Sequence, residues 1–284
     1  MMKRSFLNEL YYKAFQTGNR VNTFIAINVL VFLLLGFFTL FDFFSKSAIS
    51  TTLIHLLALP ANLTDFLFHP WTLFTYMFTQ RDFLHILFNL LWLYWMGIIF
   101  LDFLNNRQLT FLYIAGGVAA GLTFLLLFNL VPFFYSDQAL LIGSSGSVFA
   151  ILTATATLVP NYTLRLLIFG DIRLKYLVAI FIILNLLGLS GGNIGGNLAH
   201  LGGGLFGFLY IKALRSGNDW SKLFQRKPKL RVVKNPQPPK DKHTFPNQEY
   251  IDSILDKISQ SGYNSLTKAE KEALFNAGKQ QDQK

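Results

Sequence analysis

Cysteine is absent from this chain of 284 residues, and charged residues are scarce. Without cysteine the chain can form no disulfide, no thiolate nucleophile and no cysteine-ligated metal site. Charged residues make up 14% of the sequence, against about a quarter in soluble domains. The histidines, at positions 55, 69, 85, 200 and 243, show no metal-ligand spacing. We therefore expect neither a metal nor a cofactor.

Apolar residues are abundant, at 52% of the chain. The charge deficit is confined to residues 21–214, and both ends are polar and basic. This pattern predicts a polytopic membrane protein. The net charge of +10 fits cytosolic segments that face the anionic lipid of a bilayer, and we do not expect nucleic acid as a partner.

A spanning helix needs about 20 mostly apolar residues. Six segments approach this pattern, although the last two are short: 22–44, 84–101, 108–131, 144–160, 174–190 and 197–214. The sequence thus predicts an all-α membrane protein with six transmembrane helices. Residues 1–20 lack the short apolar core and cleavage site of a signal peptide, so we expect the first span to remain as an anchor.

The lysines and arginines of the predicted loops fall mostly on one side of the membrane. Only Lys46 and Arg81 lie on the other side. By the positive-inside rule both termini are cytosolic, which fits a bacterial inner membrane. Spans two, four and six then begin at the outer side. His85, Ser145 and His200 lie close to these three starts and therefore at similar depth.

The predicted domain organisation has four parts. Residues 1–20 form a cytosolic segment, 21–215 the membrane domain, 216–246 a basic Pro-rich linker, and 247–284 a small helical hairpin. Within 21–215, residues 45–83 are too apolar for a solvated loop and too interrupted to span, so we expect them to lie in the outer interface.

The hairpin is predicted from short local patterns. Ile251, Leu255 and Ile258 have helical spacing, and Thr267 with Glu270 matches a capping box. Leu274 and Phe275 continue as an apolar face. The partner of this tail is unknown from the sequence.

Ser145 and His200 are the most informative residues, because polar groups inside membrane segments are costly and usually functional. A serine needs a general base to act as a nucleophile, and His200 is the candidate. Small faces on both spans would bring the two helices together. Gly146, Ala150 and Ala154 follow the serine, and Gly203 and Gly207 follow the histidine. No acidic residue is assigned near His200, so a Ser–His dyad is predicted.

Acyl transfer also requires donors for the developing oxyanion. Ser145 begins a predicted helix, whose first N–H groups are unpaired. His85 and Asn89 share one helical face four residues apart. These two side chains could instead simply tie helices together, as polar groups do in membranes. For Asn28, Asn129 and Asn185 the prediction is only that they bond between helices.

Three motifs together resemble the rhomboid intramembrane serine proteases. They are His85-x-x-x-Asn89, Gly143-x-Ser145-Gly146 and Ala199-His200-x-x-Gly203-x-x-x-Gly207. The resemblance covers about residues 20–214 and also includes Pro70-Trp71 ahead of residues 74–78. The hairpin lies outside it.

The resemblance implies a Ser145 nucleophile, a His200 base, and His85, Asn89 and the Ser145 N–H as oxyanion donors. Phe149 would pack against the catalytic histidine, where many relatives carry Tyr. Thr72 stands where many rhomboids carry Arg. The implied substrates are single-span membrane proteins that are cut near the outer end of their span. The Gly-rich segment 191–196 would be a mobile cap.

Two other functions remain open at this stage. One is a rhomboid-like protein without protease activity that binds membrane clients. Such proteins usually lack the serine or the histidine, and both are present here. The other is a small transporter, which predicts inverted repeats and a polar site at the midplane. Neither feature is evident in this sequence.

Overall fold

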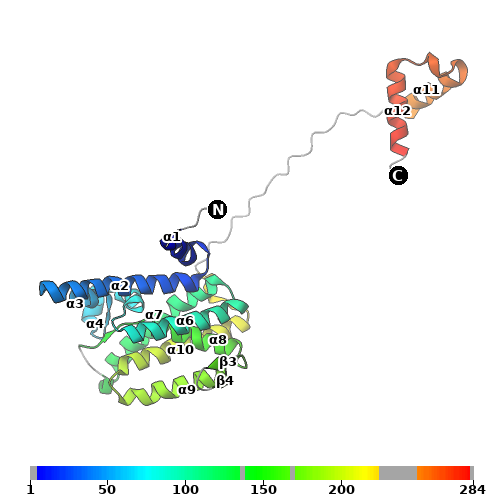
Figure 1. Cartoon of the computed structure of the whole chain (residues 1–284). Coiled ribbons are helices and arrows are strands. Elements are labelled where there is room, and N and C mark those ends of the chain that lie inside the picture. Colours follow the sequence, from blue (N-terminus) through cyan, green and yellow to red (C-terminus); the bar gives the residue numbers. More distant parts are fainter. Residues whose placement is uncertain (1–4, 135–137, 167–169, 224–247, 282–284) are drawn as a thin grey trace. The chain divides into compact units, whose positions relative to one another are not determined.

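The computed structural model describes residues 5–134, 138–166, 170–223 and 248–281. The chain divides into two compact units, Met1–Arg226 and Lys227–Lys284. The larger unit is a bundle of helices at the six predicted spans (Figure 1). These helices are α2 (Arg20–Ser45), α6 (Phe83–Phe103), α7 (Asn106–Leu130), α8 (Ser145–Leu158), α9 (Leu174–Leu187) and α10 (Ile194–Arg215).

Among the described residues, α2, α6 and α7 are long and apolar enough to cross a membrane. Helices α8 and α9 are apolar but have 14 residues each. Helix α10 has 22 residues and is rich in glycine. The expected spans therefore all exist as helices, while the number that cross the bilayer stays a prediction.

Helix α8 lies at the centre of the bundle and contacts α6, α7, α9 and α10. Its residues 146–156 are all buried. The predicted small faces of α8 and α10 do meet: a Cβ atom on Gly203 would collide with the carbonyl oxygen of Gly146, and one on Gly207 with that of Ala150. Glycine at these places therefore lets the two backbones touch.

Helix α10 begins three residues earlier than the sequence predicts. Asn193 caps it by accepting a hydrogen bond from the backbone N–H of Gly196 (3.1 Å). Half of the predicted cap segment 191–196 is thus helical. A Cβ atom on Gly195 would lie 2.9 Å from the ring of Phe124 in α7. The predicted cap therefore packs tightly against α7 at this end.

Several short elements connect α2 to α6. They are α3 (Ile49–Leu57), β1 (Leu59–Pro60), α4 (Leu63–Phe68), α5 (Thr72–Thr75) and the 3-10 helix η2 (Tyr76–Phe78). Strand β1 pairs antiparallel with β2 (Leu140–Leu141), which follows the 3-10 helix η3 (Pro132–Phe134). Leu67 and Phe68 are almost three-quarters exposed, as expected for a segment in the membrane interface.

Thr72 is fully buried and donates a hydrogen bond to the carbonyl oxygen of His69 (2.6 Å). The neighbouring Trp71 donates its indole N–H to the carbonyl oxygen of Leu56 (2.9 Å). Thr72 thus forms a local hydrogen bond at the place where many rhomboids carry Arg. The Trp71 bond joins the start of α5 to α3, and the Thr72 bond stabilises the turn before α5.

Two further pairs of short elements were not expected from the sequence. The N-terminal segment contains α1 (Phe6–Tyr11) and the π-helix η1 (Tyr12–Gln16). Strands β3 (Thr163–Leu166) and β4 (Gly170–Arg173) pair antiparallel between α8 and α9. The pair joins a buried helix to one that is exposed along much of its length.

Residues 216–223, assigned to the linker from the sequence, instead fold onto the bundle. Asp219 forms an ion pair with Arg107 at the start of α7 (2.8 Å). Trp220, in the 3-10 helix η5 (Trp220–Lys222), packs against Phe206 and Tyr210. An acid and an aromatic ring thus anchor this segment, a pairing that only the fold creates. The remaining linker residues, 224–246, lie outside the described residues.

The Asp219 carboxylate accepts several hydrogen bonds from protein groups. Partial burial raises the pKa of Asp219, but hydrogen bonds from Ser221 and Tyr210 and the nearby Arg107 charge outweigh this effect. The net result is a pKa below the ordinary value for aspartate. The carboxylate therefore stays charged and keeps the chain after α10 attached to α7.

The second unit consists of α11 (Gln248–Ser261), the 3-10 helix η6 (Tyr263–Ser265) and α12 (Lys268–Gln281). Ile251, Ile254 and Leu266 form its small core. Leu255 and Phe275, expected on the apolar face, are instead 48% and 64% exposed. The capping box is formed as predicted.

Candidate active site

Ser145 is the first residue of α8 and the accessible serine of its motif. The neighbouring Ser144 and Ser147 are fully buried, whereas Ser145 is partly exposed. Ser144 accepts a hydrogen bond from Gln80 Nε2 (3.2 Å), and Ser147 faces the sulfur of Met77 (3.8 Å). Two of the three serines are thus buried and in contact with other residues, and Ser145 is the one that is accessible.

Gly143 brings His85 and Ser145 to one place. Its φ of +114° is a conformation that side-chain-bearing residues rarely adopt. A Cβ atom here would lie 2.7 Å from Cε1 of His85 and 3.7 Å from Oγ of Ser145. The side chains of His85 and Ser145 therefore both lie against Gly143, and only glycine fits between them.

His200, on α10, is held by two residues from other helices. Its Nδ1 lies 2.7 Å from Oδ1 of Asn185 in α9. The ring of Phe149 in α8 stacks on the imidazole, with the centroids 5.5 Å apart and the planes 12° from parallel. Phe149 thus occupies the packing position that the resemblance implies. Asn185 was predicted only to bond between helices, and its role at the site was missed.

The Asn185 amide has a defined orientation. Its Nδ2 donates to the carbonyl oxygen of Phe181 one turn earlier in α9 (2.8 Å). Its Oδ1 therefore faces His200, and an amide oxygen can only accept a hydrogen bond. This assigns the proton of neutral His200 to Nδ1 and leaves the Nε2 lone pair available as a base.

One of the close contacts between α8 and α10, that of Gly146 with Gly203, lies beside the two predicted catalytic residues. Gly146 follows Ser145, and Gly203 is one turn after His200. Among the described residues, no hydrogen bond joins the Ser145 hydroxyl to His200. Such bonds are often long in enzymes without substrate. The contact of Gly146 with Gly203 nevertheless keeps the backbones that carry Ser145 and His200 close together.

Asn89 lies one turn from His85 and belongs to a buried amide network. Its Nδ2 donates to Oε1 of Gln80 (2.9 Å), and Gln80 donates in turn to Oδ1 of Asn28 (2.8 Å). Asn28 donates to the hydroxyl of Tyr113 (3.0 Å). One N–H of the Asn89 amide therefore bonds to Gln80 and orients the side chain, and its second N–H is available to another acceptor. Nothing in the sequence distinguished Gln80.

Two of the three asparagines join helices as predicted: Asn28 joins α2 to α7, and Asn185 joins α9 to α10. Asn129 instead bonds to the carbonyl oxygen of Ala61, in the segment between α2 and α6, and to that of Leu125 in its own helix (both 2.8 Å). Within the part of the chain that the structure describes, no three His, Asp or Glu side chains are grouped as metal ligands.

Comparison with known families decides the identity of this helical bundle. The family model of the Rhomboid domain matches residues 67–217, slightly more than half of the chain. The chain belongs to the rhomboid family. This membership confirms the resemblance carried by the three motifs and the all-α membrane fold class. Helix α2 precedes the matched region of this rhomboid.

The second unit of this rhomboid matches a different model. Residues 242–283 correspond to a family of unknown function, DUF6576. No curated protein matches the chain. The membrane bundle and the hairpin are thus matched by separate family models.

Proposed function

We propose that this rhomboid is an intramembrane serine endopeptidase that cleaves single-span membrane proteins near the outer end of their span. Ser145 is the nucleophile and His200 the general base. The contact between Asn185 and His200 carries this proposal, because it leaves Nε2 of the imidazole free to accept a proton. A histidine used only for packing has no need of such an orientation.

The reaction follows from these positions. His200 Nε2 takes the proton of the Ser145 hydroxyl while Oγ attacks the scissile carbonyl carbon. The resulting oxyanion accepts hydrogen bonds from the Ser145 N–H at the start of α8, from His85 and from the remaining N–H of Asn89. His200 then protonates the leaving amine. Water attacks the acyl-enzyme, activated by the same base, and restores the serine.

Asn185 changes the predicted dyad into a Ser–His–Asn arrangement. No acid is assigned near His200 from the sequence, and an acid is not required to hold a neutral tautomer. An amide oxygen at 2.7 Å performs this role, although it stabilises the imidazolium less than a carboxylate does. Phe149 in α8 stacks on the imidazole of His200 and so holds the plane of that ring.

The substrate class follows from where the site lies along the spans. Ser145 begins α8 and His200 lies in the second turn of α10, at the side predicted to be outer. A peptide bond in a helix is hydrogen-bonded and inaccessible, so a substrate must unwind locally, and Gly or Pro lowers that cost. Both termini of the enzyme would face the cytosol of a bacterium, with the bundle in the inner membrane.

Covalent labelling of the purified protein with a fluorophosphonate or isocoumarin probe tests the proposal. We expect wild type to be labelled, and Ser145→Ala and His200→Ala to lose labelling while remaining folded. Ser147→Ala is the matched control, because this buried serine in the same helix should not affect labelling. A folded wild type without labelling would instead favour the inactive client-binding alternative.

A further inference from the structure

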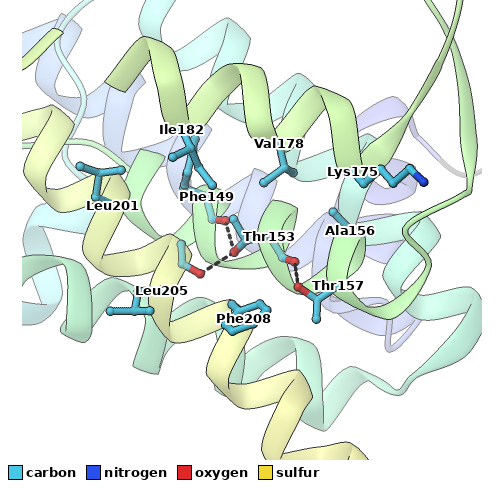
Figure 2. Close-up of a pocket in the computed structure, with 11 residues that line it drawn as sticks. Phe149, Thr153, Ala156, Thr157, Lys175, Val178, Ile182, Leu201, Leu205 and Phe208 are labelled. Carbon is cyan, nitrogen blue, oxygen red and sulfur yellow. Dashed lines mark hydrogen bonds between the residues drawn. The ribbon is translucent and has the colours of Figure 1, made fainter. Parts of the chain in front are cut away.

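A cavity of about 470 Å³ lies between α8, α9 and α10. Figure 2 shows its apolar lining, which comes from all three helices. Phe149, Val178, Ile182, Leu201, Leu205 and Phe208 form most of the wall. This volume lies within the range of about 300–1,000 Å³ that is common for small-molecule sites.

The two hydroxyl groups in the lining of the cavity are both hydrogen-bonded within the protein. The polar lining residues of the cavity are Thr153, Thr157 and Lys175. The Thr153 hydroxyl bonds to the carbonyl oxygens of Phe149 and Gly204 (both 2.9 Å), and that of Thr157 bonds to the carbonyl oxygen of Thr153 (2.7 Å). Both hydroxyls are therefore satisfied within the protein, and an apolar occupant suits this space.

Three cations gather at one end of the cavity. Lys175, at the start of α9, lines it directly. Lys212 lies over the ring of Phe208, 5.7 Å from its centroid. Arg215 donates to the carbonyl oxygens of Thr157 (2.9 Å) and Leu158 (3.0 Å) at the end of α8. Among the described residues, none of the three cations forms an ion pair with a carboxylate.

The wall of the cavity also reaches the surface of the bundle. Leu205 is 60% exposed and Phe208 42% exposed, so the cavity is accessible from the side that faces lipid in a membrane. The cations lie at the ends of the helices, where a lipid headgroup lies. An apolar interior with a cationic mouth is complementary to the acyl chain and the anionic headgroup of a membrane lipid.

We infer that this cavity binds one acyl chain of an anionic phospholipid from the cytosolic leaflet, with the phosphate beside Lys175, Lys212 and Arg215. The chain fills the apolar space between α9 and α10. The phosphate receives charge-assisted hydrogen bonds from the lysine ammonium groups and from the arginine guanidinium. A zwitterionic phospholipid offers the same chain but less net negative charge at the mouth.

The cavity is adjacent to the proposed catalytic residues through Phe149, which lines it and also stacks on His200. An acyl chain in the cavity would pack against the Phe149 ring and so restrict the position of the His200 imidazole stacked on it. This second step rests on the proposed function, whereas the binding of lipid does not. Binding is therefore measured directly and without reference to activity.

Native mass spectrometry of the delipidated full-length protein tests the inference. Phosphatidylglycerol and phosphatidylcholine with identical acyl chains are compared on wild type and on the triple variant Lys175→Gln, Lys212→Gln, Arg215→Gln. We expect wild type to prefer phosphatidylglycerol, and the triple variant to lose this preference by about fivefold per cation removed. Equal occupancy by both lipids in wild type, or an unchanged preference in the variant, would overturn the inference.

Two further variants separate this site from general surface charge. Arg20→Gln, Arg165→Gln, Lys222→Gln removes the same charge elsewhere and should keep the preference. Ala156 is a lining residue that is 6% exposed, and Ala156→Leu fills the cavity without changing charge. We expect it to lose the tightly bound lipid while its helical circular dichroism stays that of wild type. Retained binding in this folded variant would place the lipid elsewhere.

Discussion

Asn185 Oδ1 lies 2.7 Å from Nδ1 of His200 and joins the last turn of α9 to the second turn of α10. This contact gives α9 a part in the proposed chemistry, although α9 contributes no nucleophile, base or oxyanion donor. It also makes the tautomer of the base depend on where α9 lies. A displacement of α9 would release the ring and remove the reason for Nδ1 to hold the proton.

Replacing Asn185 should lower activity through the histidine. Asn185→Leu removes the acceptor, so the Nδ1 proton loses its partner and the base-ready tautomer is no longer favoured. We expect kcat to fall by about 100-fold, within the range attributed to general acid–base catalysis. Cleavage of a single-span membrane substrate by the purified protein measures this effect. Asn129→Leu, which removes an asparagine that bonds to Ala61 and Leu125 and not to His200, should leave kcat near the wild-type value.

The aspartate variant distinguishes positioning from packing. Asn185→Asp keeps the size and the acceptor but adds negative charge beside the imidazole. A nearby carboxylate favours the protonated histidine, so the acid limb of the pH–rate profile should shift to higher pH. A purely structural asparagine predicts no such shift, and an unchanged profile with full activity would contradict the assigned role.

Asn89→Ala should reduce the rate without abolishing it. The oxyanion retains the Ser145 N–H and His85 as donors, so only part of its stabilisation is lost.

Gln80→Leu should also lower the rate, although Gln80 does not reach the oxyanion, because Asn89 loses its orienting partner. It should in addition destabilise the fold by about 1–3 kcal/mol, since Asn28 and Asn89 are left with unpaired buried groups. Parallel kinetics and thermal unfolding separate the two effects.

Gly203→Ala should damage the fold as well as the site. Its methyl group would meet the carbonyl oxygen of Gly146 in α8, and forcing the helices apart costs about 1–3 kcal/mol or more. We expect a lower midpoint of thermal unfolding in detergent and loss of probe labelling. Gly36→Ala is the control, because nothing lies within 4 Å of the added methyl group in α2. Equal stability of both variants would refute the close contact.

Removal of residues 247–284 should leave probe labelling of Ser145 largely unchanged. The hairpin has its own core of Ile251, Ile254 and Leu266, and the proposed reaction uses none of its residues. The labelling rate of the truncated protein, compared with full length in the same detergent, measures this. Complete loss of labelling would make the hairpin part of the enzyme.

The hairpin should lose helix as the solution becomes acidic. Hydrogen bonds from the Thr267 backbone N–H, from Lys257 and from the Thr267 hydroxyl lower the pKa of Glu270 from 4.5 to about 2. A lowered pKa in the folded state contributes stability above the unfolded value, which is lost as pH falls from about 4.5 towards 2. Circular dichroism of a peptide covering residues 242–284 follows this change. Glu270→Gln should weaken the acid transition, and an identical transition in both peptides would contradict the role of Glu270.

Much of the membrane architecture could be read from local patterns. Apolar segments locate all six helices to within a few residues, because helices packed in a bilayer must be mostly apolar along their length. The motifs around Ser145 and His200, with glycines one or two turns away, also predicted which helices must touch. Such features depend on spacing along one helix, which the sequence contains directly.

The same reasoning could not rank the buried amides. Asn28, Asn129 and Asn185 look alike in the sequence, each an asparagine among apolar residues of a helix, yet only Asn185 meets His200. Gln80 gave no signal, because its partners lie in α2, α6 and the turn before α8. Likewise, the anchoring of residues 216–223 depends on Arg107, more than 100 residues earlier.

The sequence by itself determined the class of protein, the positions of its helices, and the serine and histidine proposed for catalysis. Only the tertiary structure decided what orients that histidine, which amide supports Asn89, and where the cavity beneath Phe149 lies. The physical reason is that a helix's hydropathy and spacing are local. Its rotation and its neighbours are instead fixed by packing against the other helices, and there the third member of the proposed site is chosen.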